Sequence, residues 1–182
     1  MARNVEIKAR IPSVAALEPR VRALAKGESV EIRQDDTFFA CPGGRLKLRQ
    51  FEEAAGELIY YVRPDRPGPK ESRYFLAPTN SPATLREVLT SAYGSCGRVK
   101  KIRQLLMIGR TRVHLDEVEG LGSFLELEVV LADGESLEAG VGEANELIAR
   151  LGLDAADLVE GAYVDLLARK GSGLPGADPL RS

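Results

Sequence analysis

The sequence predicts an α+β protein built on a closed, eight-stranded antiparallel β-barrel with helices packed outside. The chain of 182 residues contains about eight strand-like segments against three or four helical ones. The strand segments follow one another through short turns, which favours antiparallel pairing. Most of them alternate apolar with charged residues. A closed barrel places the charged faces around one interior and leaves the apolar faces to pack under helices.

The N-terminal part predicts a strand followed by a helix. Residues 4–11 alternate strictly between polar and apolar side chains, as the two faces of a strand do. Ser13 is a suitable N-cap for the next segment and Gly27 a suitable stop, although Pro19 disfavours a regular helix. The apolar residues at helical spacing between them are Val14, Leu17, Val21 and Leu24.

Four further strands are expected before the middle of the chain. Asp35 and Asp36 interrupt the pattern of the first, and a Gly-Gly pair turns the chain into the second. The segment 64–69, rich in proline, must be a loop. The four expected strands are residues 30–40, 45–51, 57–63 and 70–76.

The second half predicts a helix and then a run of long strands. Ser81 is a good N-cap with Pro82 at the first helical position, and Gly94 ends this helix. Residues 99–107 have a strand pattern. Residues 112–131 contain two alternating runs around a Gly-Leu-Gly turn, which indicates a hairpin.

The C-terminal part predicts two helices and a tail. Residues 135–151 have helical spacing, and a last helix is expected to start at Asp154 and to include residues 164–167. The segment 171–182 is rich in Gly and Pro and is expected to be disordered. The elements therefore form one domain over residues 1–170.

The composition excludes several classes of protein. The net charge of −2 does not suggest a nucleic-acid partner, and no apolar run is long enough for a membrane span. No signal-peptide pattern precedes the first strand, and Cys41 and Cys96 form no CxxC pair. A cytoplasmic location is therefore expected. His114 is the only histidine, which excludes zinc sites built on several histidines and leaves oxygen ligands, hence Mg²⁺ or Mn²⁺.

The charged faces carry charge in blocks. Three cations share one face of the strand 45–51, and Lys101 and Arg103 share a face of another. Glu126 and Glu128 lie two apart on a third strand and can converge on one divalent ion. Any one of these faces taken alone is more typical of a solvated surface. Taken together they favour a barrel interior, since cations, carboxylates and a divalent metal are the groups that bind polyphosphate.

The chain also resembles a known family, the CYTH proteins or triphosphate tunnel metalloenzymes, which include class IV adenylyl cyclases and thiamine triphosphatases. Their N-terminal ExExK strand is matched by Asn4-Val5-Glu6-Ile7-Lys8. The resemblance covers residues 2 to about 168, and it is nearest to the class IV adenylyl cyclase branch. Its other matching segments are Leu46–Arg49, Tyr61–Arg63, Lys101–Arg103, Arg112 with Asp116, and Phe124–Glu128.

The resemblance implies a role for the charged residues that match the family pattern. Glu6, Glu126 and Glu128 would be ligands of Mg²⁺ or Mn²⁺, and Lys8 and Asp116 would be catalytic. Asp116 would do so by supporting the metal or by positioning a basic residue. Asn4 replaces the first Glu of ExExK, which removes one carboxylate and puts a second metal ion in doubt. The triphosphate would be held by Lys8, Lys47, Arg49, Arg63, Lys101, Arg103 and Arg112.

Three functions fit these expectations. The first is a metal-dependent cyclase that converts ATP to cyclic AMP and pyrophosphate. The second is a triphosphatase acting on thiamine triphosphate, tripolyphosphate or a nucleotide, and the third is a noncatalytic triphosphate-binding protein. Neither a nucleic acid nor a membrane is expected as a partner, and a homodimer is one expectation because dimers occur among such relatives.

Overall fold

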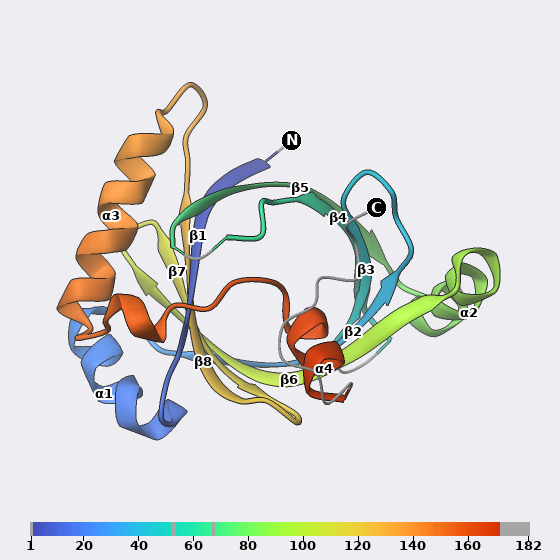
Figure 1. Cartoon of the computed structure of the whole chain (residues 1–182), viewed down its shortest axis with the longest axis horizontal. Helices are drawn as coiled ribbons and strands as arrows, with labels where there is room; N and C mark the ends of the chain where they lie inside the picture. Colours follow the sequence, from blue (N-terminus) through green and yellow to red (C-terminus); the bar gives the residue numbers. More distant parts are fainter. Residues whose placement is uncertain (1, 52–53, 67, 172–182) are drawn as a thin grey trace.

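The computed structural model describes residues 2–51, 54–66 and 68–171, in which eight strands close into a barrel (Figure 1). Neighbouring strands are all antiparallel, in the order β1-β5-β4-β3-β2-β6-β7-β8. The predicted fold class is therefore confirmed. The strands are β1 (Ala2–Arg10), β2 (Val30–Phe39), β3 (Arg45–Gln50), β4 (Gly56–Val62), β5 (Lys70–Thr79), β6 (Ser95–Ile108), β7 (Thr111–Val118) and β8 (Gly122–Val130).

The helices lie on the outside and at one end of the barrel (Figure 1). Helices α1 and α3 cover β1, β6, β7 and β8, while α2 packs beside β2 and β3. Helix α4 lies across one opening of the barrel against β6. No helix in the described part of the chain is long and apolar enough to cross a bilayer. The helices are α1 (Val14–Leu24), α2 (Pro82–Tyr93), α3 (Leu137–Arg150), the 3₁₀ helix η1 (Ala155–Asp157) and α4 (Tyr163–Gly171).

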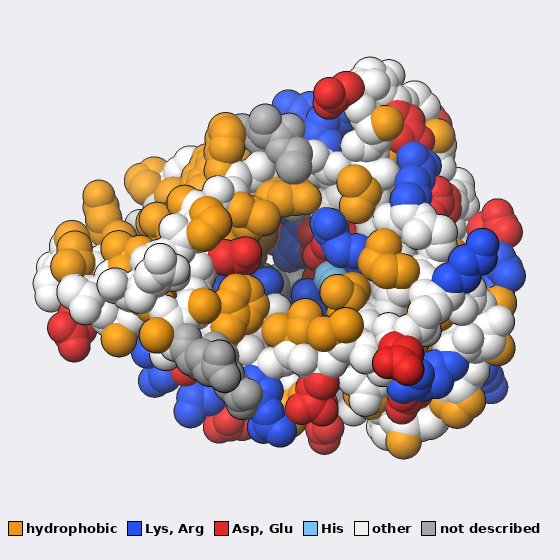
Figure 2. Space-filling model, turned by 180° about the vertical axis from the view of Figure 1, so that it is seen from behind, with side chains coloured by type: hydrophobic (Ala, Val, Ile, Leu, Met, Phe, Trp, Pro, Cys, Tyr) orange, Lys and Arg blue, Asp and Glu red, His pale blue; other side chains and the backbone are white. Residues whose placement is uncertain are grey.

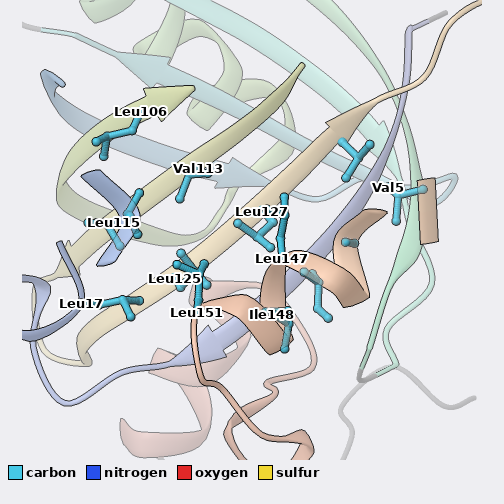
Figure 3. Packing of buried hydrophobic residues seen from close by; sticks show 14 of the residues in the cluster. Val5, Leu17, Leu106, Val113, Leu115, Leu125, Leu127, Leu147, Ile148 and Leu151 are labelled. Atoms are coloured by element: carbon cyan, nitrogen blue, oxygen red, sulfur yellow. The ribbon is translucent and has the colours of Figure 1, made fainter. Parts of the chain in front are cut away.

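The main apolar core lies outside the barrel wall, between β1, β7 and β8 and the helices α1 and α3 (Figure 3). Val5, Leu115 and Leu127 are fully buried there, and Leu147 of α3 and Leu17 of α1 pack onto them. Burying each such side chain contributes about 1.5–3 kcal/mol. On β1, β7 and β8 the apolar face thus points outward to the helices, and the charged face is turned to the barrel interior.

A second apolar cluster closes the barrel at the end where α4 lies. Phe38, Val99 and Phe124 point into this end and pack against Tyr163 of α4. Gly97 permits this packing, because a Cβ atom there would lie 2.6 Å from Cγ2 of Val164. One end of the interior is therefore filled by side chains.

Most predicted elements are confirmed, with changes at their ends. Strand β6 begins at Ser95 rather than at residue 99, and α1 is a regular helix in spite of Pro19. The predicted last helix is wrong at its start, because Asp154 caps only η1. After η1 the chain is extended, since Leu158 bridges to β1, and α4 starts only at Tyr163. Residues 172–182 of the predicted tail lie outside the described residues.

Candidate active site in the barrel interior

The barrel encloses a cavity of about 400 Å³, which is lined by side chains from all eight strands. Figure 2 shows it as a hollow with Lys or Arg, Asp or Glu and His side chains inside and hydrophobic side chains around its rim. The lining includes seven Lys and Arg side chains against five carboxylates. The open rim includes Ile32, Leu76 and Leu105, and α4 closes the opposite end.

The structure brings nearly all predicted site residues into this one cavity. Asp116 is the exception: its side chain is completely buried behind Lys101 and Arg103 and does not line the cavity. The predicted residues that do line it are Glu6, Lys8, Lys47, Arg49, Arg63, Lys101, Arg103, Arg112, Glu126 and Glu128.

His114, Glu126 and Glu128 form a group whose ligand atoms all lie within 4.8 Å of one another. Nδ1 of His114 is 3.8 Å from a carboxylate oxygen of each glutamate, too far for a hydrogen bond, and has no other partner among the described residues. Burial, helped by Arg103, lowers the pKa of His114, which favours the neutral imidazole. An imidazole and two carboxylates are a donor set that suits Mn²⁺, and the carboxylates also suit Mg²⁺.

Glu6 lies beside this group but not within it. Its carboxylate forms a buried ion pair with Arg63, and Glu6 is paired in register with Glu128. Burial raises the pKa of Glu6. Arg63 acts to lower this pKa, whereas the neighbouring Glu126 and Glu128 raise it further. Asn4 is the next residue along on the same face, where its Oδ1 atom is buried without a hydrogen-bond partner in the described chain. This unpartnered oxygen points to a polar occupant at this part of the cavity.

Asp116 lies two residues from His114 on β7 and organises the cations next to this group. It accepts hydrogen bonds from Lys101 Nζ at 2.8 Å, from Arg103 at 2.6 and 2.7 Å, and from the Tyr163 hydroxyl at 3.0 Å. Burial opposes the charged form, but Arg103 and Lys101 hold the pKa of Asp116 well below its usual range. Asp116 is therefore a permanent anion that fixes two cations.

Lys8 is the most confined cation of the cavity wall. Its Nζ atom lies 4.0 Å from the centre of the Tyr163 ring, 3.8 Å from Glu126 Oε1, and 3.3 Å from the carbonyl oxygen of Gly161, to which it donates. Burial lowers the pKa of Lys8 to about 8, against the attraction of Glu126. A fraction of Lys8 is therefore a neutral amine near neutral pH.

Sequence reasoning missed several residues of the site. Asp36 is buried and holds Lys47, but in the sequence it only interrupts a strand pattern. Its inward direction could have been found from its two-residue spacing to Gln34 and Phe38, which share its face.

Tyr163 gave no local signal, because it reaches the cavity from a segment far along the chain. Lys70 lies in the expected strand 70–76 but was given no role, and the structure buries it opposite Glu6 in register, behind the residues that line the cavity.

Comparisons with known proteins agree with this geometry. The model of the CYTH domain matches residues 2–163. Adenylate cyclase CyaB of Aeromonas hydrophila is 27% identical over 169 residues, which cover 88% of this chain and 86% of that protein.

Solved structures show the same fold. A protein of Pyrococcus horikoshii superimposes with a TM-score of 0.80 at 23% identity, over 90% of this chain and 98% of its own. An adenylyl cyclase homologue from Hippeastrum, described as having a dominant triphosphatase activity, has a TM-score of 0.65 at 15% identity, over 94% and 96% of the two chains. With the family model covering most of the sequence, this chain belongs to the CYTH domain family.

Proposed function

We propose that this protein is a metal-dependent enzyme that acts on a triphosphate, and that its first activity is the conversion of ATP to cyclic AMP and pyrophosphate. The observation that carries the proposal is the single cavity of about 400 Å³ that combines seven cationic side chains with the His114, Glu126 and Glu128 group. A buried surplus of cations is stabilised by a polyanion. The similarity to an adenylate cyclase of Aeromonas hydrophila supports the cyclase over other triphosphate reactions.

The cations would hold the phosphates from several sides. Arg and Lys bind nonbridging phosphate oxygens through charge-assisted hydrogen bonds. Arg63 and Arg112 are paired with Glu6 and Glu128, so they would bridge the phosphates and the acidic side of the cavity. The remaining phosphate contacts would come from Lys8, Lys47, Arg49, Lys101 and Arg103.

Glu126, Glu128 and His114 would hold Mg²⁺ or Mn²⁺, with Glu6 and the amide oxygen of Asn4 beside them. A divalent ion bound there supplies positive charge to phosphate oxygens and offsets the charge that develops during phosphoryl transfer. The imidazole of His114 makes Mn²⁺ the better fitting ion.

In the cyclase reaction the ribose 3′-oxygen forms a bond to the α-phosphorus. The bond from that phosphorus to the bridging oxygen then breaks, and pyrophosphate leaves with the electron pair. Lys8, with its pKa lowered to about 8, would accept the proton of the attacking hydroxyl in its neutral form, and as a cation it would then remain beside the phosphates. Asp116 would act as a positioning residue, because its oxygens are occupied by Lys101, Arg103 and Tyr163.

A triphosphatase is the second candidate, and it uses the same cavity. Water would attack the terminal phosphorus, and the only difference is which phosphorus meets the nucleophile. The Hippeastrum homologue, which has a dominant triphosphatase activity, favours this alternative. A noncatalytic binding protein is the third candidate, since Asn4 removes one carboxylate from the metal side.

Product analysis separates the three candidates. The pure protein is incubated with ATP, thiamine triphosphate or tripolyphosphate in the presence of Mg²⁺ or Mn²⁺. Cyclic AMP with pyrophosphate in equal amounts supports the cyclase, and orthophosphate supports the triphosphatase. Binding without turnover leaves the noncatalytic protein. Failure to bind any of the three compounds would contradict the whole proposal.

A further inference from the structure

Strands β2 and β3 share a compact arrangement of three buried charges. Lys47 and Arg49 of β3 lie on either side of Asp36 of β2, which is 3% exposed. Lys47 Nζ is 2.8 Å from Asp36 Oδ2, and Arg49 donates from Nε to Oδ1 at 2.8 Å and from Nη2 to Oδ2 at 2.9 Å. We call these three residues the β2–β3 clamp.

Strands β6 and β7 repeat the arrangement atom for atom. Lys101 Nζ is 2.8 Å from Asp116 Oδ2, and Arg103 donates from Nε to Oδ1 at 2.6 Å and from Nη2 to Oδ2 at 2.7 Å. These three residues are the β6–β7 clamp. In both clamps the Lys and the Arg of a Lys-x-Arg segment on one strand pair with a single buried aspartate on the neighbouring strand. The aspartate of the β6–β7 clamp was expected from the sequence, whereas that of the β2–β3 clamp was not.

We propose that Asp36 is a positioning residue that acts through Lys47 and Arg49, and that the two clamps hold different phosphoryl groups of one substrate. This proposal rests on the proposed function. Because Nε and Nη2 of Arg49 are both turned to Asp36, the remaining Nη1 group is directed away from the carboxylate. Asp36 also offsets the repulsion between two neighbouring buried cations.

The two clamps adjoin β2 from its two sides, at positions four residues apart along that strand. In register, Arg49 is opposite Asp36 of β2, while Arg103 is opposite Ile32 of β2. Four residues of a strand span roughly 13 Å at about 3.3 Å per residue. Because β3 and β6 lie on opposite sides of β2 and the cations of both clamps line the cavity, the clamps would meet a phosphate chain from different strands and at different points. A substrate with more linked phosphoryl groups therefore gains a second set of contacts.

The clamps differ in their connection to the metal-binding group. Arg103 Nη2 also pairs with Glu126 Oε2 at 2.7 Å. Among the described residues, the ion pairs of Lys47 and Arg49 are with Asp36 alone. Loss of Asp36 should therefore weaken phosphate binding without changing metal binding, whereas loss of Asp116 should change both.

Asp36→Asn tests the inference, and Asp35→Asn is the matched control. Asp35 is the preceding residue of the same strand, but it pairs with Arg98 on the exposed side. Each variant is titrated calorimetrically with tripolyphosphate and with pyrophosphate in the presence of Mg²⁺, and with Mn²⁺ alone. For Asp36→Asn we expect the Kd for tripolyphosphate to rise about tenfold, or about 1.4 kcal/mol. The preference for tripolyphosphate over pyrophosphate should shrink, Mn²⁺ affinity should stay unchanged, and Asp36→Glu should restore part of the loss.

Two results for folded Asp36→Asn would overturn the inference and leave the proposed function standing. One is unchanged or tighter binding of tripolyphosphate, and the other is an equal loss of affinity for tripolyphosphate and pyrophosphate. Wild-type protein that binds no tripolyphosphate would overturn both the inference and the proposed function. If Asp36→Asn does not fold, Arg49→Lys gives the same test, because it keeps the charge but loses the two-pronged contact. Its tripolyphosphate preference should then fall, and an unchanged preference would reject the inference.

Discussion

At the scale of single residues, the interior depends on carboxylates that pair with more than one cation. Asp116 fixes Lys101 and Arg103, and Glu126 lies between Lys8 and Arg103. Buried ions of one sign would be strongly unfavourable alone, so each carboxylate stabilises the cations that face it. The residues predicted to bind substrate therefore also contribute to the stability of the barrel, because their charges offset one another.

The first prediction concerns the metal-binding group. Replacing Glu126 and Glu128 together by Gln should abolish Mn²⁺ binding, because two of the three donors lose their charge. Calorimetric titration with Mn²⁺ measures this, with Glu143→Gln on the outer helix α3 as a control. A double variant that keeps wild-type Mn²⁺ affinity would place the metal elsewhere.

The second prediction concerns acid stability. The pKa of Asp116 is held low in the folded protein, so its ionised form contributes stability above its unfolded pKa of about 3.9. This contribution is lost as the pH falls from about 5 toward the folded pKa. The free energy of unfolding of Asp116→Asn should be well below that of the wild type at pH 7, and the two should converge at low pH. Urea unfolding at several pH values measures it, and a constant difference would contradict it.

At the scale of elements, the position of α4 decides whether the barrel has one opening or two. Arg45 of β3 donates to Asp165 of α4 at 2.7 Å, and Lys170 donates to the carbonyl oxygen of Gly120 at 2.7 Å. Gly97, with φ of 153°, gives α4 room to reach β6. The helix is therefore held at both ends over one end of the cavity.

The third prediction tests this packing. Gly97→Ala should lower the melting temperature, because the new Cβ would meet Val164 Cγ2 at 2.6 Å and the backbone conformation is unfavourable for alanine. Adding Val164→Ala should recover the steric part of the loss and leave the backbone part. Thermal unfolding of the single and double variants measures it. Equal melting temperatures for Gly97→Ala and wild type would show that α4 packs differently.

At the scale of the whole molecule, the fold is a barrel with a charged cavity inside and its main apolar core outside. The helices α1 and α3 supply the partner surface for the outward apolar faces of the strands. The interior is then free to hold the cations and carboxylates that line the cavity. A polyanion with a divalent ion should consequently stabilise the fold as well as occupy the site.

The fourth prediction follows from that charge distribution. Tripolyphosphate with Mg²⁺ should raise the melting temperature, since a ligand at 100 times its Kd adds about 2.7 kcal/mol to the free energy of unfolding. Differential scanning calorimetry measures it. Sulfate at equal ionic strength is the control for general salt effects, and EDTA should reduce the shift. An equal shift with sulfate alone would mean that no specific polyphosphate site exists.

The sequence by itself determined the elements and the face on which each charge lies. Strict alternation at residues 4–11, 45–51 and 112–131 fixes the inward and outward side chains, because the period of a strand is two. That alternation, with the family resemblance, was enough to predict the barrel and most of the charged residues that line its cavity, although not Asp36.

Only the tertiary structure decided which of these charges meet. Asp36 pairs with Lys47 and Arg49 because of the register between β2 and β3. Tyr163 contacts Lys8 and Asp116 because helix α4 returns to the barrel from the end of the chain. His114 joined Glu126 and Glu128 for the same reason, since register set it opposite Glu126, and Glu128 lies two residues further along β8 on the same face. Local patterns carry no information on register or on long-range packing, because both are fixed by contacts between distant segments.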